Sequence, residues 1–471
     1  MARRKGKRNK AAPTAVAPVS NRFDAAGSGR RLRGWVAPAS GPNRAIRQGA
    51  TTLRNRARDA ARNEWAAKAT RTRWAVNLVG TGIVPRPRKQ PPDVKRLLTD
   101  LWDAWVPVAD ADGTLDFYGL QAQVAGNWIE SGELFVRLRT RRVEDGLPVP
   151  LQLQLIESDV CPLWDSRANN GNEIRQGIEF DRVGRRVAYW MYRDHPNDDR
   201  PLAATDLVRV PADMVIHVFE PTRPGQIRGV SEFSTILAKL RGVADFDDAV
   251  LDRQKLANLF AFFITNAGNP AVRVDPLTGL PAESGDDGEP MAPIQPGTGQ
   301  VLNPGEEVTF SDPPGPGADY DDYMRIQSQH LAAGSGLPYE LLTGDLRDVS
   351  DRALRVIVNE FRRHCEQRQW HILIPQLCRR VRNEWAALAA LAGAIPADLE
   401  AAARSVTWVP QGWPYFHPTQ DVQAERQAVE AGFKSRDGVI TARGDDPEAI
   451  DEQRAEGAER ETRLILPRTG G

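Results

Sequence analysis

Four residues in the C-terminal half of the chain are of metal-ligand types. His364, Cys365, His371 and Cys378 fall within fifteen residues of one another. Imidazole and thiolate groups are common zinc ligands, but a zinc module usually presents them in short, closely spaced pairs. On one continuous helix these four side chains would point in different directions around the axis. The spacing therefore predicts buried or half-buried helix residues and no metal site.

Three clusters of aspartate could hold the divalent cation that a phosphoryl-transfer enzyme requires. They are Asp245/Asp247/Asp248, Asp319/Asp321/Asp322 and Asp445/Asp446. The second cluster begins a predicted helix, where negative charge complements the helix dipole. The third falls in a charged segment that we predict to be a flexible tail. A metal-dependent nuclease that uses Asp321 and Asp322 is the enzymatic alternative.

The motifs of common enzyme classes are absent from the sequence. It has no G-x-x-x-x-G-K-[ST] phosphate-binding loop and no G-x-S-x-G nucleophile motif. Its six histidines have no evident nucleophile partner. We therefore predict a structural protein rather than an enzyme, with no catalytic residues, no cofactor and no metal.

The distribution of charge along the chain is strongly asymmetric. Lys and Arg total 62, as do Asp and Glu, yet residues 1–90 carry 22 basic and three acidic residues and therefore a net charge of +19. A concentrated basic segment can bind nucleic acid by releasing counterions, or bind an acidic surface of a neighbouring subunit. Both alternatives apply to the four arginines of one predicted helix in this segment. They are Arg54, Arg56, Arg58 and Arg62.

Length and composition predict a globular protein of two or three domains, and the helical and alternating patterns described below predict the α+β class. The 471 residues are 41% hydrophobic, which is ordinary for a globular chain. The longest apolar runs fall well short of the roughly 20 residues that a membrane-spanning helix needs. The three cysteines are too few for a disulfide framework. We expect a soluble, intracellular protein without a membrane partner.

The longest helical pattern is followed by a proline-rich segment and then by more helix. Ser231 can cap a helix that we predict to continue to Asn266, with apolar residues at three- and four-residue steps. Residues 267–318 contain ten prolines and an acidic cluster, and include strand-like pieces at 300–302 and 307–310. Helical periodicity resumes at Asp319 and ends near 336. The chain thus leaves along one helix and returns along another.

The segments on either side of this helix pair are also predictable. Helices are expected over Gly41–Trp74 and Pro92–Trp105, and after Asp116 as N-cap. Short alternating segments then predict a β-rich module. These segments are 134–138, 151–155, 177–180, 187–192 and 215–219. Later, Ser350 caps a helix with a kink at Pro375, and Thr419 caps a last firm helix that ends at Gly432, followed by a charged, flexible tail.

Five sequence segments, in this order along the chain, are similar to those of one protein family. They are Leu53-Arg54-Asn55-Arg56-Ala57-Arg58-Asp59 through Asn63, Asn77-Leu78-Val79-Gly80-Thr81-Gly82-Ile83-Val84-Pro85, Glu130-Ser131-Gly132-Glu133, Pro224-Gly225-Gln226-Ile227-Arg228-Gly229-Val230-Ser231, and Gly336-Leu337-Pro338-Tyr339-Glu340-Leu341-Leu342-Thr343-Gly344-Asp345. Over residues 30–420 the chain resembles the lambda-type family of tailed-bacteriophage portal proteins.

This resemblance implies a portal-protein fold with a mixed wing module, long stem helices, a small α/β clip and a helical C-terminal crown region. The implied parts are a disordered basic tail (1–30), the wing (31–230), stem helix 1 (231–266), the clip (267–318), stem helix 2 (319–336), the tunnel loop (337–349), a wing-crossing helix and return (350–418), and the crown with a flexible tail (419–471).

The resemblance also implies a function and its partners. It implies a ring, typically a dodecamer, at one capsid vertex of the virion, through which double-stranded DNA is packaged and ejected. Implied partners are the terminase motor, the head-tail adaptor and the major capsid or scaffold protein, with assembly in the host cytoplasm. A basic-tailed nucleic-acid-binding protein is the second alternative, and it would be a monomer whose affinity resides in residues 1–90.

Two sets of residues would face the DNA in such a ring. The tunnel loop would present its tip to the duplex, and the acidic part of the first stem helix would line the channel. The tip residues are Leu342, Thr343, Gly344, Asp345, Leu346, Arg347, Asp348 and Val349, and the stem candidates are Asp245, Asp247, Asp248 and Arg253. Nearly balanced or acidic charge there would avoid tight phosphate contacts that slow sliding.

Overall fold

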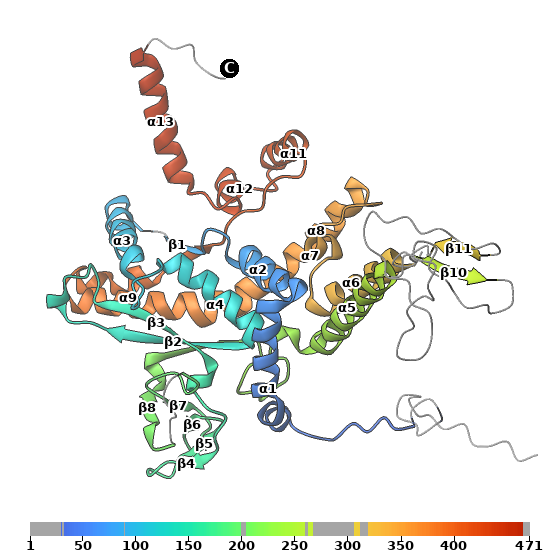
Figure 1. Ribbon diagram of the computed structural model, residues 1–471. Helices are drawn as coiled ribbons and strands as arrows, with labels where there is room; N and C mark the ends of the chain where they lie inside the picture. Colours follow the sequence, from blue (N-terminus) through green and yellow to red (C-terminus); the bar gives the residue numbers. More distant parts are fainter. Residues whose placement is uncertain are drawn as a thin grey trace, which may run out of the picture.

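The computed structural model describes residue 30 and residues 33–88, 90–198, 204–259, 262–266, 306–310 and 319–464. The fold is α+β, as predicted: a central body of helices packs on a three-stranded sheet, and a second, five-stranded sheet lies beside it (Figure 1). A pair of long helices projects to one side of the body and carries a two-stranded ribbon, and the C-terminal helices rise from another side (Figure 1).

The N-terminal part of the body is helical. It consists of α1 (Pro42–Asn63), α2 (Trp65–Val79), α3 (Pro92–Trp105) and α4 (Phe117–Ser131). The single helix predicted over Gly41–Trp74 is divided in two at Glu64. This residue has an extended backbone (φ −114°, ψ 124°) and lies between the end of α1 and the start of α2. The Asp116 carboxylate caps α4 by accepting a hydrogen bond from the Gly119 amide at 2.6 Å.

Two antiparallel sheets form the β-rich module that alternation predicted. The three-stranded sheet has the order β3 (Leu151–Ile156), β2 (Glu133–Thr140), β9 (Val215–Phe219). The five-stranded sheet has the order β4 (Ser166–Arg167), β5 (Glu173–Arg175), β6 (Ile178–Phe180), β7 (Arg186–Met191), β8 (Val208–Pro211). The strands at β4, β5 and β8 were not predicted, because they are two to four residues long and show no clear alternation.

The main core joins segments from both ends of the chain. β1 (Val84–Pro87) pairs with β12 (Val406–Val409), although more than 300 residues separate them in sequence. Beneath this pair, Trp102 stacks edge-on against Phe117 and Trp385, with ring centroids 5.4 and 5.3 Å away. Such aromatic contacts stabilise a core beyond the area that they bury.

The predicted helix over 231–266 is wrong at both ends. A 3₁₀ turn (Glu232–Thr235) comes first, α5 covers Leu237–Leu259, and Phe262–Asn266 forms β10. β10 pairs antiparallel with β11 (Glu306–Phe310), because aromatic and β-branched residues at 262–265 favour a strand once a partner is available. The predicted strand at 307–310 is present, whereas the piece at 300–302 lies outside the described residues, as do residues 267–305 and 311–318.

The chain returns along α6 (Tyr320–Ser335) and the short helix α7 (Tyr339–Thr343). A long helix then crosses the body as α8 (Asp351–Arg368), a π-helical stretch (Gln369–Cys378) and α9 (Arg379–Leu391). Ser350 caps α8 as predicted, its hydroxyl accepting a hydrogen bond from the Ala353 amide at 3.2 Å. Pro375, the predicted kink, lies inside the π-helical stretch, since proline cannot donate to the regular helical ladder.

The C-terminal region is more helical than its sequence predicted. It contains α10 (Glu400–Arg404), α11 (Pro418–Glu430), α12 (Arg436–Ala442) and α13 (Pro447–Leu464). The flexible tail expected after Gly432 is therefore wrong for residues 436–464. Ser435 caps α12, and Arg436 pairs with Asp451 of α13 at 2.6 Å, which joins the two helices. The remaining short 3₁₀ turns are Val106–Val108, Val143–Asp145, Ser158–Val160, Ala204–Asp206, Ala212–Met214 and Ala397–Leu399.

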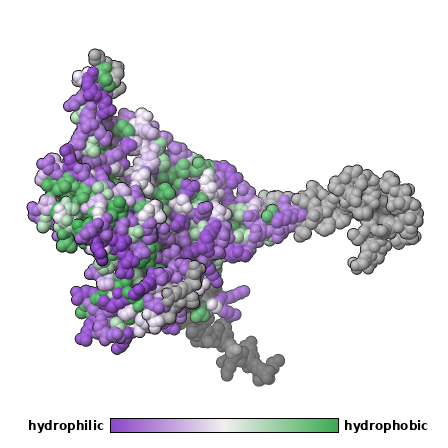
Figure 2. Space-filling view, turned by 60° about the vertical axis from the view of Figure 1, so that its left-hand side comes forward, coloured by the Kyte–Doolittle hydropathy of each residue, from purple (hydrophilic) through white to green (hydrophobic). Residues whose placement is uncertain are grey.

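No helix among the described residues is both long and apolar enough to span a membrane. The predicted basic tail, residues 1–30, lies outside the described part except for its last residue. The space-filling view shows mainly hydrophilic residues on the projecting helix pair and on the raised C-terminal helix (Figure 2).

Candidate channel and interface surfaces

Two of the five sequence segments meet in the core of the β-rich module. Glu133 begins β2, and Arg228 precedes the turn into α5, 95 residues later. The Arg228 guanidinium lies 2.6 Å from Glu133 Oε1, and both residues are buried, at 0% and 2% exposure. Arg228 also donates hydrogen bonds to the carbonyls of Gln176 and Cys161, at 2.7 and 3.0 Å. One arginine thus joins β2, the five-stranded sheet and the start of the helix pair.

Two glycines, Gly132 and Gly229, allow the two segments to pack with their backbones in direct contact. A Cβ atom on Gly132 would lie 2.2 Å from the carbonyl carbon of Val230, and one on Gly229 would lie 2.0 Å from the Gly132 oxygen. Gly132 also has a positive φ of 88°, which side chains disfavour. The Gly229 amide donates to Glu133 Oε2 at 2.8 Å. These two motifs therefore encode one packing contact rather than two separate turns.

His217 completes the buried network as a neutral ring. Its Nε2 lies 2.9 Å from Glu133 Oε2, and its Nδ1 lies 3.2 Å from the Arg186 guanidinium. Arginine can only donate, so Nδ1 accepts and Nε2 carries the proton. Burial lowers the pKa of His217 to about 4. Burial alone would raise the pKa of Glu133, but Arg228 and His217 outweigh it and hold that pKa well below its usual range.

Two of the four arginines predicted to form a basic contact surface are paired within the subunit. Arg54 is 5% exposed and lies 3.0 Å from Asp159. Arg58 bridges Asp159 and Glu157 at 2.7 and 2.9 Å. The prediction that Arg54 and Arg58 contact DNA or a neighbour is therefore wrong. Their four-residue spacing on the same face as the small buried alanines of α1 is the sequence signal that could have shown this.

The other two arginines of α1 remain at the surface. Arg56 and Arg62 are exposed, and Arg62 lies 3.9 Å from Asp59, an exposed residue of the same helix. An exposed pair at this distance contributes little to stability. Arg56 and Arg62 are therefore the part of the predicted basic surface that is available for contacts outside the subunit.

The predicted loop tip begins two residues later than expected. Leu342 and Thr343 belong to α7, and Leu342 is buried in the main core at 4% exposure. Leu342 cannot face a channel, because its side chain packs inward, so that prediction is wrong. Residues 344–349 form the exposed or partly exposed loop, and Asp348 has a left-handed backbone, with φ 61°. Aspartate tolerates this conformation better than most residues.

Ion pairs fix this loop against α6. Arg347 lies 2.9 Å from Asp345 and 3.1 Å from Asp321, and Arg325 lies 3.4 Å from Asp348. The Tyr339 hydroxyl donates to Asp345 at 2.7 Å. Hydrogen bonds from Arg347 and Tyr339 lower the pKa of Asp345. The loop and α6 together thus present three carboxylates and two guanidiniums in a fixed, slightly acidic arrangement.

The acidic residues predicted to line a stem are on the outer surface of α5. Asp245, Asp247, Asp248 and Arg253 are all exposed. Asp245 pairs with Arg241 at 2.8 Å, and the Tyr320 hydroxyl of α6 donates to Asp247. Phe246 packs on Tyr323 with ring centroids 4.6 Å apart. These contacts hold α5 and α6 side by side (Figure 1), and they leave the acidic side chains at the surface.

The suggested metal ligands do not converge. Cys365 and Cys378 are buried in the core, whereas the His364 side chain is 58% exposed. Elsewhere in the described residues, Glu157, Asp159 and His195 lie close enough to share an ion. Arg58 and Arg54 already neutralise those two carboxylates, so the charge of the site does not favour a divalent cation.

The family is shown by a match over most of the chain. Residues 28–369 match the family model described as phage portal protein, lambda family. The chain belongs to that family. The resemblance predicted from the five motifs is confirmed, and the portal family is structural rather than enzymatic, so the nuclease alternative is not favoured.

Curated relatives that are named portal proteins align with most of the chain. The chain is 28% identical to the "Probable portal protein" of Halomonas phage phiHAP-1, over 89% of this chain and 82% of the relative. It is 22% identical to the "Portal protein" of Escherichia phage N15, over 90% and 87%. It is also 22% identical to "Portal protein B" of Escherichia phage lambda, over 62% and 60%.

Among solved structures, similar chains include one from a gene transfer agent (GTA) particle and one phage portal protein. One is from the neck of a native GTA particle computed with C12 symmetry, with a TM-score of 0.44 and 16% identity over 92% of this chain and 96% of the other. Another is an HK97 family phage portal protein from Corynebacterium diphtheriae, with a TM-score of 0.30 and 11% identity over 78% and 96%.

Proposed function

We propose that this portal-family chain assembles into a dodecameric ring at one capsid vertex, and that double-stranded DNA passes through its centre during packaging and ejection. The observation that carries the proposal is the family match over residues 28–369. That range includes both sheets, the α5–α6 pair, the loop at 344–349 and α8. The proposed site is the virion, with assembly in the host cytoplasm.

In this proposal the parts of the fold take the roles that the resemblance implies. The region up to 230 is the wing, α5 and α6 are the stem, and residues 267–318, to which we add the β10 strand that pairs with β11, are the clip. Residues 344–349 are the tunnel loop, α8 through α9 crosses the wing, and α11 to α13 form the crown. The projection of α5 and α6 away from the body (Figure 1) supports the stem assignment.

The charge of the loop suits a surface past which DNA slides. Its guanidiniums are already paired with carboxylates, Arg347 with Asp345 and Asp321. Arginine held this way is less available to bind phosphate, and each phosphate that a protein neutralises strengthens DNA binding. The exposed Asp245, Asp247 and Asp248 of α5 would add negative charge to the same channel.

The exposed Arg56 and Arg62 of α1 are proposed to contact an acidic surface of the neighbouring subunit. A closed ring requires two different complementary surfaces on each subunit, and the charge asymmetry of the chain could provide them. The terminase motor, the head-tail adaptor and the capsid or scaffold protein are the proposed external partners.

The test of the ring is the mass and shape of the purified full chain. Native mass spectrometry with negative-stain imaging at moderate salt should give rings of about a dozen copies with a central hole. Arg56→Gln with Arg62→Gln should shift the population toward monomer, whereas Arg185→Gln, which changes an exposed arginine in the turn between β6 and β7, should not. A wild-type chain that stays monomeric at every concentration would contradict the proposal.

The test of the loop is a charge reversal. Asp345→Lys with Asp348→Lys should leave rings intact and reduce DNA packaged per particle, because unpaired lysines would hold phosphates. Asp112→Lys with Glu144→Lys makes the same change at two exposed sites outside the loop and should package normally. Normal packaging by the loop variant would show that the loop does not face DNA.

A further inference from the structure

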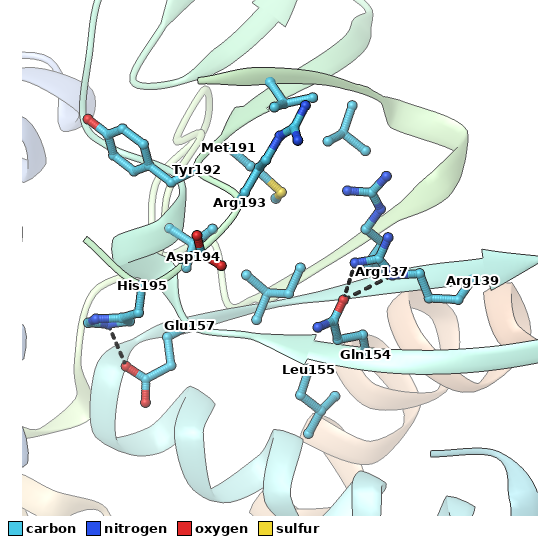
Figure 3. A pocket seen from close by; sticks show the side chains of 14 residues that line it. Arg137, Arg139, Gln154, Leu155, Glu157, Met191, Tyr192, Arg193, Asp194 and His195 are labelled. Carbon is cyan, nitrogen blue, oxygen red and sulfur yellow. Dashed lines mark hydrogen bonds and ion pairs between the residues drawn. The ribbon is translucent and has the colours of Figure 1, made fainter. Parts of the chain in front are cut away.

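A cavity of about 590 Å³ lies between the two sheets, away from the proposed channel (Figure 3). One wall comes from β2 and β3, and the other from β7, β8 and the residues that follow β7. Its lining combines three arginines with a largely apolar floor. The arginines are Arg137, Arg139 and Arg193, and the floor is formed by Ile156, Val160, Met191, Val208 and Val210.

The arginines reach the cavity from β2 and from the segment that follows β7. Arg137 and Arg139 are two residues apart on β2, so their side chains lie on the same face of the strand. Figure 3 shows these two side chains next to each other, with Arg193 extending from the opposite wall. The β-strand spacing therefore brings two guanidiniums together, and the segment that follows β7 adds a third.

These guanidiniums are not neutralised within the described part of the chain. Arg139 donates to the neutral amide oxygen of Gln154, at 2.9 Å from Nε. Neither Arg137 nor Arg193 has an ion pair among the described residues, and the buried Nε of Arg137 has no hydrogen-bond partner there. Burial and the nearby Arg139 lower the pKa of Arg137. A partly buried charge beside a like charge is unfavourable unless something pairs with it.

The acidic residues at the other end of the cavity do not provide that pairing. Glu157 lies 2.9 Å from Arg58 and 3.4 Å from His195, and Figure 3 shows its carboxylate directed at the His195 ring. The cavity therefore has unpaired guanidiniums at one end and two carboxylates in the rest of its lining, Glu157, which is already paired, and the exposed Asp194 next to Arg193 in sequence, with an apolar floor between them. A ligand that fits must carry both negative charge and apolar groups.

We propose that this cavity binds an extended acidic segment of a partner protein, in which carboxylates alternate with aliphatic side chains. The carboxylates would pair with Arg137, Arg139 and Arg193, and the aliphatic side chains would cover the apolar floor. A nucleic acid fits less well, because its phosphates would satisfy the arginines and leave the apolar floor without a partner. The proposal does not depend on the channel, since it concerns a different face of the subunit.

The experiment uses the full chain and a short fluorescein-labelled peptide of alternating Glu and Leu. Fluorescence anisotropy should show binding to the wild type and no binding of the matched peptide of alternating Gln and Leu. Arg137→Gln and Arg193→Gln should each weaken binding at least about tenfold, as expected for a lost charge-assisted hydrogen bond. Arg185→Gln lies on the same module outside the cavity and should bind like the wild type.

A second measurement separates loss of binding from loss of fold. Because Arg137 lacks a partner, Arg137→Gln should leave the unfolding midpoint unchanged or raise it, whereas a purely structural arginine would lower it. The proposal is wrong if the Glu peptide does not bind, if the Gln peptide binds equally, or if Arg137→Gln binds as well as the wild type. It is also wrong if duplex DNA or inorganic phosphate binds these arginines and the Glu peptide does not.

Discussion

The same pairing of carboxylate with guanidinium serves two different purposes in two regions of this molecule. At the junction of the β-rich module and the helix pair, Glu133 and Arg228 are buried and fully surrounded by partners. At the loop, Arg347, Asp345 and Asp321 make comparable contacts at the surface, with side chains 15–71% exposed. Burial removes the alternative of pairing with water, so the first network holds the fold together. The second mainly sets the shape and charge that the loop presents.

The largest effect should come from breaking the buried pair. Glu133→Gln leaves Arg228 buried without a counter-charge, and removal of one member of such a pair costs about 3–5 kcal/mol of stability. Urea denaturation followed by circular dichroism would measure the change. Glu173→Gln is the control, because its carboxylate is exposed and 3.7 Å from Arg175. A loss no larger than that of the control would mean that the buried network does not stabilise the fold.

The buried network should also make stability depend on pH through His217. Its pKa is lowered to about 4 in the folded chain, against about 6.5 for an unperturbed histidine. The unfolded state therefore takes up the proton first, and the stabilisation present above pH 6.5 is lost as pH falls toward 4. The slope is up to about 1.4 kcal/mol per pH unit from this group. His217→Gln, which can still donate to Glu133, should reduce the pH dependence of the unfolding midpoint between pH 6.5 and 4. An unchanged pH dependence would mean that His217 is not the titrating group.

The close backbone approach predicts a somewhat smaller effect. Gly132→Ala places a Cβ 2.2 Å from the Val230 carbonyl carbon at a φ of 88°, and should destabilise by roughly 2–4 kcal/mol from overpacking and backbone strain together. Gly146→Ala is matched, since Gly146 has a φ of 73° but open space around it. It should cost only the strain, about 1–2 kcal/mol. Equal unfolding midpoints for the two variants would show that the close contact with Val230 adds no cost beyond the backbone strain.

The smallest effect on stability should come from the exposed loop. Arg347→Gln removes the pairs with Asp345 and Asp321, yet these side chains remain accessible to water, so the unfolding midpoint should not change measurably. Proteolysis of the loop should become faster, because Arg347 joins it to α6. A large fall in the unfolding midpoint of Arg347→Gln would show that the loop network stabilises the fold, as the network around Glu133 does. The two regions would then not differ in the way described above.

Local signals predicted much of the fold. Asp116 and Ser350 cap the helices that they were expected to cap, and the alternating segments at 134–138 and 151–155 are paired strands. Prediction failed where a distant partner decided the outcome. Residues 262–266 pair with 306–310 rather than extending α5, and Arg54 and Arg58 face Asp159 rather than solvent.

The sequence by itself determined most of the helices up to residue 432, half of the twelve described strands and the motifs that identify the family, because capping, periodicity and glycine spacing act over a few residues. The tertiary structure alone decided that Glu133 meets Arg228 from 95 residues away, that Leu342 is buried, and that two arginines of β2 and one from the segment after β7 line one cavity. Whether a charged side chain is paired or available depends on the groups packed around it, and the fold brings those groups from distant parts of the chain.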